Sequence, residues 1–81
     1  MAKDLLDLHG YKVDEVEAAL DRFLVQVSNS SLKRARIMTG KGTGAVQSVT
    51  IKYLKLAGYP WEFEKLANGK RNEGCLVIFL E

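Results

Sequence analysis

The chain has 81 residues, of which 47% are apolar and 27% are charged, with a formal net charge of +2. This length predicts a single domain over residues 1–81, near the size at which burial of apolar surface only just offsets chain entropy. The high apolar fraction and the interspersed charges exclude a disordered chain. The small positive charge permits a nucleic-acid partner but does not identify one, because many unrelated domains are equally basic.

Cysteine and histidine counts restrict the chemistry further. The sequence contains one cysteine, Cys75, and one histidine, His9. An internal disulfide and a structural zinc site are therefore both excluded. No apolar run is long enough to span a bilayer, and residues 1–10 lack the order of a signal peptide. We therefore expect a cytoplasmic domain with a metal-independent fold and no membrane partner.

The first half of the chain predicts a strand, a helix and a second strand. Residues 4–9 are typical of a short strand, and residues 13–28 follow with helical spacing. Lys12 stands where a capping Ser or Thr is usual, so we expect the start of this helix to fray. Residues 34–38 alternate as a second strand. The helix is predicted to bury one stripe, made of Val13, Val16, Leu20, Phe23, Leu24 and Val27.

A second helix is predicted over residues 44–57. Thr43 is its expected N-cap, and Gly58 is its expected left-handed stop. Ile51 lies off the predicted buried stripe and is therefore a candidate for a protein contact. That stripe consists of Ala45, Val46, Val49, Tyr53, Leu56 and Ala57.

The remainder predicts two strands separated by a polar loop. Residues 61–64 alternate apolar and acidic side chains after Pro60, which is typical of an edge strand. Residues 75–80 are apolar throughout, as in an interior strand, and residues 68–74 form the loop between them. The order is βαβαββ, and two right-handed crossovers place both helices on one face. We expect an α/β two-layer sandwich with a four-stranded mixed sheet and a partly open second face.

The first candidate site lies at the end of the first strand. Alternation places Leu6 and Leu8 under the helices, with Asp7 and His9 on the open face. A carboxylate in an apolar strand is costly unless it is hydrated or paired. Asp7 is thus a candidate to orient an imidazole, bind a metal or activate water; the alternative is a solvated surface residue. His9, which precedes a glycine, is either a catalytic group or a turn residue with a satisfied hydrogen bond.

The second candidate site is the turn over residues 39–44, which follows the second strand. Ligands of open α/β sheets gather beyond the carboxyl ends of parallel strands, where helix N-termini also point. Three glycines permit close approach of a phosphate, and Lys41 and Thr43 supply a charge and a hydroxyl. The turn is not a P-loop, because Gly42 rather than Ser or Thr follows Lys41. The alternative is that these glycines only make a tight turn. The residues concerned are Thr39, Gly40, Lys41, Gly42, Thr43 and Gly44.

Further cations are predicted to reach the same edge of the sheet. Because the third strand runs parallel to the first two, the loop with Lys70 and Arg71 is expected to emerge beside His9. Arg36, on the second strand, and Tyr11, just after the first site, complete the expected phosphate-binding surface. The alternative is that the loop is only a charged, solvated hairpin.

Together these residues resemble a known family, the Smr (small MutS-related) domain, over essentially the whole chain. The resemblance rests on the two candidate sites at their separation along the chain, together with the start of the first helix and the C-terminal glycine before an apolar strand. The matching segments are Leu6-Asp7-Leu8-His9-Gly10, Val13-Asp14-Glu15-Val16, Ile37-Met38-Thr39-Gly40-Lys41-Gly42-Thr43-Gly44 and Gly74.

The resemblance implies a fold like the C-terminal domain of translation initiation factor 3. It also implies binding of DNA, including branched DNA, or RNA, with DNA-nicking or RNA-cleaving activity in many members. Such domains often form the C-terminus of larger MutS-like proteins of DNA repair or recombination control. By this resemblance Asp7 and His9 hold the catalytic positions, and Gly40 and Gly42 hold the second motif. This sequence departs at Thr39, where many members have His.

The sequence therefore leads to two hypotheses. In the first, the domain hydrolyses phosphodiesters. Asp7 activates or orients the attacking water, directly or through a divalent ion such as Mg²⁺, and His9 orients or protonates the reacting phosphodiester. The residues of the glycine turn, with Lys70 and Arg71, then hold the phosphate. In the second, which Thr39 and the modest net charge favour, the domain binds nucleic acid or a protein partner without cutting.

Overall fold

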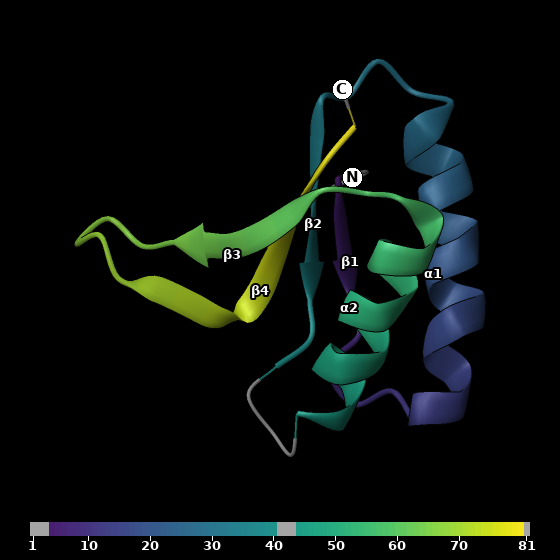
Figure 1. The fold of residues 1–81 in the computed structure, drawn as a ribbon, viewed down its shortest axis with the longest axis horizontal. Helices are drawn as coiled ribbons and strands as arrows, with labels where there is room; N and C mark the ends of the chain where they lie inside the picture. Colours follow the sequence, from purple (N-terminus) through teal and green to yellow (C-terminus); the bar gives the residue numbers. More distant parts are fainter. Residues whose placement is uncertain (1–3, 41–43, 81) are drawn as a thin grey trace.

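The computed structural model describes residues 4–40 and 44–80, and its elements follow the predicted order βαβαββ (Figure 1). The predicted bounds of the first helix and second strand are confirmed, and those of the second helix differ by one residue. The elements are β1 (Leu5–Asp7), α1 (Val13–Ser28), β2 (Arg34–Met38), α2 (Ala45–Ala57), β3 (Trp61–Lys65) and β4 (Arg71–Phe79).

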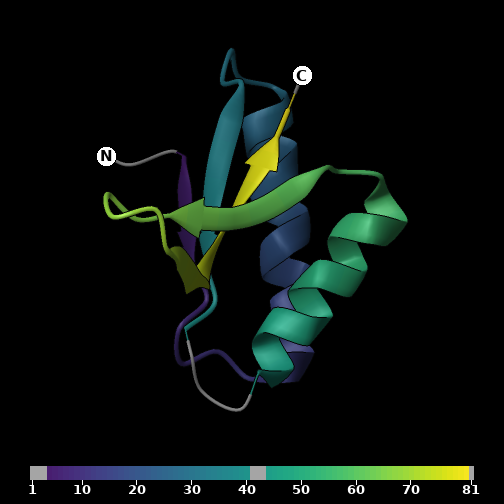
Figure 2. The same cartoon turned by 60° about the vertical axis from the view of Figure 1, so that its left-hand side comes forward.

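Within the described residues the strands form a four-stranded mixed sheet in the order β1-β2-β4-β3. β1 is parallel to β2, whereas β4 is antiparallel to both β2 and β3. Both helices lie on one face of this sheet (Figure 2). The predicted two-layer fold is therefore confirmed, with β3 at an edge and β4 in the interior.

The core lies between the helices and one face of the sheet. Leu8, Ile37, Leu76 and Ile78 are completely buried on the sheet side. Val13, which was predicted to be buried, is 44% exposed, because the first turn of α1 extends beyond the strands (Figure 1). α1 contributes Val16, Ala19, Leu20, Phe23, Leu24 and Val27 to the core.

The buried face of α2 differs from the predicted stripe. Leu56 is 80% exposed, and Ala45 and Ala57 are also exposed. Thr50 and Leu54 are instead completely buried. The Thr50 hydroxyl donates to the Val46 carbonyl at 2.8 Å, and this hydrogen bond lets a polar side chain enter the core. Ile51, predicted to lie off the buried stripe, is partly buried against the core together with Val46, Val49 and Tyr53.

The side chain of Glu15 holds the start of α1, where the sequence predicts fraying. Lys12 has extended backbone geometry, and its N–H donates to the Glu15 carboxylate at 3.0 Å. This is one half of a capping box, and it satisfies a backbone group that the lysine side chain cannot serve.

The β3–β4 connection is also different from its prediction. β4 begins at Arg71, so residues 71–74 belong to a strand and not to the predicted loop. The pairing of β3 with β4 shifts between Phe63 and Glu64. Cys75, at the centre of β4, is 2% exposed, and burial raises the pKa of its thiol. Among the described residues no helix is long and apolar enough to cross a bilayer.

Candidate functional site at the carboxyl ends of the parallel strands

The ends of β1 and β2 lie next to each other. Asp7 pairs with Met38 in the parallel register, and the Leu8 N–H donates to the Met38 carbonyl at 2.7 Å. Leu8 is completely buried, whereas Asp7 and His9 on either side of it are exposed. β1 is shorter than the predicted strand over residues 4–9 and ends at Asp7, so His9 lies in the turn that follows. Asp7 and His9 are nevertheless both exposed at this end of the sheet, as expected.

A tight turn holds the first of these segments. The Tyr11 N–H donates to the Leu8 carbonyl at 3.0 Å, and Gly10 has a φ of +84°, as a type II turn requires at its third position. Asp7 Oδ1 accepts the His9 backbone N–H at 2.9 Å. The Asp7 carboxylate therefore has a structural role as a turn acceptor, which also fixes its position at the strand end.

Thr39 and Gly40 begin the second turn and are anchored to β4. The N–H groups of Thr39 and Gly40 both donate to the Gly74 carbonyl, at 2.8 and 3.1 Å. Thr39 is only 7% exposed, and its hydroxyl donates to the Gly40 and Gly74 carbonyls at 3.3 and 3.5 Å. The Thr39 hydroxyl is therefore directed into the protein, and the inclusion of Thr39 in the phosphate-binding turn stays a prediction for its backbone alone.

The N-terminus of α2 lies at the same end of the molecule. Gly44 is its N-cap with a φ of +81°, and its carbonyl accepts the Ser48 N–H at 2.9 Å. No acidic residue stands in the first turn of α2, so the positive end of the helix dipole is not neutralised there by its own side chains. The predicted N-cap Thr43 and the predicted phosphate ligands Lys41 and Gly42 lie outside the described residues.

Gln47 was missed by the sequence analysis. Its side-chain amide donates to the Glu73 carbonyl and ties the first turn of α2 to β4. The only signal in the sequence was its position one helical turn after the glycine turn. We call the surface made by Asp7, His9, Gly40 and Gly44 the rim; β1 and β2 point towards it, and α2 begins beside it (Figure 1).

Arg36 and Tyr11 are two further residues of the predicted nucleic-acid-binding surface. Arg36 lies on the open sheet face, where its guanidinium forms an ion pair with Glu64 at 3.2 Å. Glu64 also accepts the Asn72 side-chain amide at 3.2 Å. The charge of Arg36 is thus engaged within the sheet. Tyr11 is 41% exposed and directly follows the glycine of the first turn.

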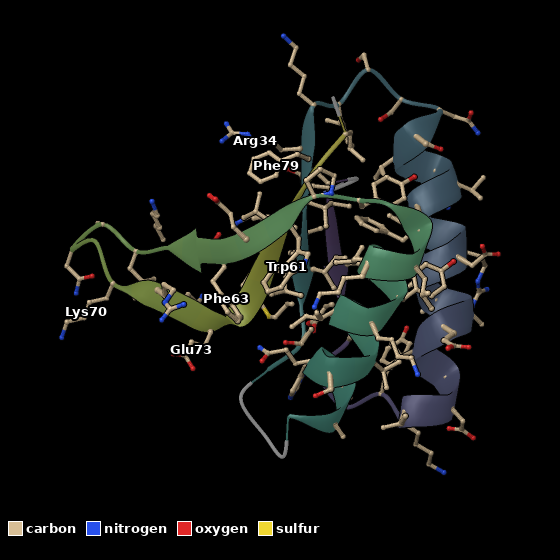
Figure 3. The ribbon with its side chains drawn as sticks, in the orientation of Figure 1. Arg34, Trp61, Phe63, Lys70, Glu73 and Phe79 are labelled. Atoms are coloured by element: carbon tan, nitrogen blue, oxygen red, sulfur yellow. The ribbon has the colours of Figure 1, made fainter. Side chains whose placement is uncertain are left out.

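Lys70 and Arg71 do not lie at the rim. Figure 3 places Lys70 at the tip of the β3–β4 hairpin, which projects away from the ends of β1 and β2. β3 does run in the same direction as β1 and β2, but the register shift after Phe63 carries the hairpin outwards. The predicted convergence of these two cations on His9 is therefore wrong.

Few groups at the rim are suited to metal coordination. In the part of the chain that the structure describes, no three His, Cys, Asp or Glu side chains gather closely enough to hold a metal ion. Asp7 and His9 are the described rim residues with titratable side chains. Asp7 and His9 are therefore the described rim side chains that can transfer a proton.

Comparison with known proteins agrees with the fold. The family model for the Smr domain matches residues 6–81. Endonuclease MutS2 of Exiguobacterium sibiricum is 42% identical over 76 residues, and that of Fusobacterium nucleatum is 33% identical over 76 residues. Each alignment covers 94% of this chain and 10% of the relative, so the chain spans about a tenth of these proteins' length.

A solved structure shows the same architecture. The crystal structure of the Smr domain of Thermus thermophilus MutS2 superposes with a TM-score of 0.80 at 27% sequence identity. The match covers 96% of this chain and 98% of that domain. With a family model that spans nearly all of its residues and a shared fold, this chain belongs to the Smr domain family.

Proposed function

We propose that this domain binds nucleic acid at the rim and hydrolyses a phosphodiester bond there. The observation that carries the proposal is the exposed pair Asp7 and His9 on one turn, beside the N-terminus of α2. A helix N-terminus favours an anion, and a carboxylate with an imidazole is suited to proton transfer. The name endonuclease carried by the MutS2 relatives supports the same reaction class.

In this proposal each of the two side chains has one role. Asp7 accepts a proton from a water molecule as the water oxygen attacks phosphorus. His9 donates a proton to the oxygen that leaves as its bond to phosphorus breaks. The positive end of the helix dipole, where α2 begins at Gly44, stabilises the added negative charge on the phosphoryl oxygens.

A second function is binding without cutting. The observation that favours it is Thr39, whose buried hydroxyl donates to the carbonyls of Gly40 and Gly74 and so offers no proton donor to the rim. In this alternative the turn of Asp7 and His9 only shapes a phosphate-binding surface, and the domain positions nucleic acid for another active site.

The experiment that separates these functions uses the purified 81-residue chain. Nicking of supercoiled plasmid is measured with and without Mg²⁺ or Mn²⁺, and binding to a labelled oligonucleotide is measured in parallel by fluorescence anisotropy. The proposal predicts both binding and nicking. Binding without nicking under every condition supports the alternative, and the absence of binding contradicts both functions.

A further inference from the structure

The distal part of the β3–β4 hairpin is a separate structural unit. β4 pairs with β2 only as far as Cys75, and the Gly74 carbonyl receives the last hydrogen bonds from the β2 side. Beyond that point Glu64 pairs with Asn72 and Lys65 with Arg71, so a two-stranded ribbon continues without a third strand. We call residues 64–73 the arm. Figures 1 and 2 both show it projecting from the body of the domain.

The arm has a defined conformation. At its tip, the Leu66 N–H donates to the Lys70 carbonyl at 2.7 Å, and the Gly69 N–H donates to the Leu66 carbonyl at 2.9 Å. Asn68 accepts the Lys70 N–H through its side chain at 3.0 Å. At its base, Glu64 is held by Arg36 and by Asn72. The arm is thus fixed at both ends by hydrogen bonds.

The arm carries three cations and two acids, Glu64 and Glu73, and its cations cluster towards the tip. Lys65, Lys70 and Arg71 are all exposed, and no acidic residue lies between them in the sequence. The Arg71 guanidinium lies 5.6 Å from the centroid of the Phe63 ring, a cation–π contact that orients it. Of the two acids at the base of the arm, Glu64 is paired with Arg36, and Glu73 follows the three cations in the sequence. The three cations are therefore available to an external anion.

We propose that the arm binds in the groove of a DNA duplex. The inference rests on the proposed nucleic-acid binding and adds the form of the partner and a second contact away from the rim. Three cations on one ribbon suit the paired phosphate backbones that border a groove. The major groove of B-form DNA admits a two-stranded β-ribbon.

The composition of the arm distinguishes among nucleic acids. Single strands are bound mainly by aromatic side chains on which bases stack, and residues 64–74 contain no aromatic residue. Phe63, at the base of the arm, is already occupied by two contacts. Arg71 lies over its ring, and Trp61 forms a T-shaped pair with it, with the ring centroids 5.2 Å apart. Duplex RNA has a major groove too narrow for side chains to read. B-form DNA is therefore the partner that fits.

The test compares two variants with the same loss of charge. K65Q/K70Q neutralises two cations of the arm, and K52Q/K55Q neutralises two exposed lysines on α2. Affinity for a labelled DNA duplex, its single strand and an RNA duplex of the same sequence is measured by anisotropy at several salt concentrations. For the arm variant we expect duplex DNA affinity to fall about tenfold or more, and the salt slope to decrease by about 2. K52Q/K55Q and the charge-preserving variant K65R/K70R are expected to change affinity less than about threefold.

Each other outcome overturns the inference at a defined point. If K65Q/K70Q and K52Q/K55Q lose the same amount of duplex DNA affinity, the effect comes from net charge alone and not from the arm. If K65Q/K70Q binds the DNA duplex as tightly as the parent chain does, the arm is not a DNA contact, and the proposed function is unaffected. Equal losses for single-stranded DNA or duplex RNA contradict the choice of partner. A parent chain that binds none of the three contradicts the proposed function itself, and the arm inference falls with it.

Discussion

Replacement of Asp7 by Asn is expected to reduce plasmid nicking by about 100-fold or more, the usual contribution of a general base. DNA binding is expected to stay within about threefold of the parent value, since the change alters a single surface group. The substitution is informative because the side-chain oxygen of Asn still accepts the His9 N–H, which Asp7 Oδ1 accepts at 2.9 Å. The turn is kept, and only the ability to take up a proton is lost. Plasmid nicking and anisotropy on the same preparations measure both quantities.

Two further variants separate catalysis from turn structure. Asp21→Asn is the matched control, because Asp21 is an exposed acid on α1 whose carboxylate accepts the Tyr53 hydroxyl at 3.1 Å. It is expected to nick at the parent rate. Asp7→Ala removes the turn acceptor as well and is expected to lower the free energy of unfolding by about 1 kcal/mol. An Asp7→Asn protein that nicks at the parent rate would show that the carboxylate has only the structural role.

The largest effect on stability is expected at Leu54. This side chain is completely buried, so Leu54→Ala is expected to lower the free energy of unfolding by about 2–5 kcal/mol. A domain of this size has only a few kcal/mol of stability, so a large fraction of the variant is expected to be unfolded at 25 °C. Urea denaturation followed by far-UV circular dichroism measures the change.

Leu56 provides the control on the same helix. It is 80% exposed, and Leu56→Ala is expected to change the free energy of unfolding by less than about 0.5 kcal/mol. The stripe predicted from the sequence contains Leu56 and not Leu54, so it predicts the opposite order. A larger loss at position 56 than at position 54 would contradict the orientation of α2 described here.

The order of the elements and the bounds of the helices were readily predicted, whereas the orientation of α2 was not. The periodicity of residues 13–28 and the glycine at position 58 are local signals, and they marked the helix bounds to within one residue. The face that α2 buries depends on how it packs against α1 and the sheet. Because Leu56 is apolar and Thr50 is polar, the side-chain types alone favoured the wrong buried face of the helix. The hydrogen bond from Thr50 to Val46 explains why a hydroxyl occupies the core.

The part of the candidate site that follows from strand topology, the position of the two turns, was predicted from the sequence. Carboxyl ends of adjacent parallel strands must lie together, which is why the two turns were expected at one edge of the sheet. The position of Lys70 and Arg71 depends on the register shift after Phe63, which leaves no signal in the alternation of the strand. The burial of Thr39 depends on the Gly74 carbonyl, a contact between residues far apart in the chain.

The most direct test of the rim as the nucleic-acid site is an NMR titration of the ¹⁵N-labelled chain with a short DNA duplex. The amide signals of His9, Gly10, Gly40 and Gly44 are expected to shift progressively and to saturate with a single dissociation constant. Signals from the exposed side of α1, such as those of Glu17 and Val25, are expected to stay unchanged. Shifts confined to α1, with the rim amides unaffected at saturation, would contradict the account.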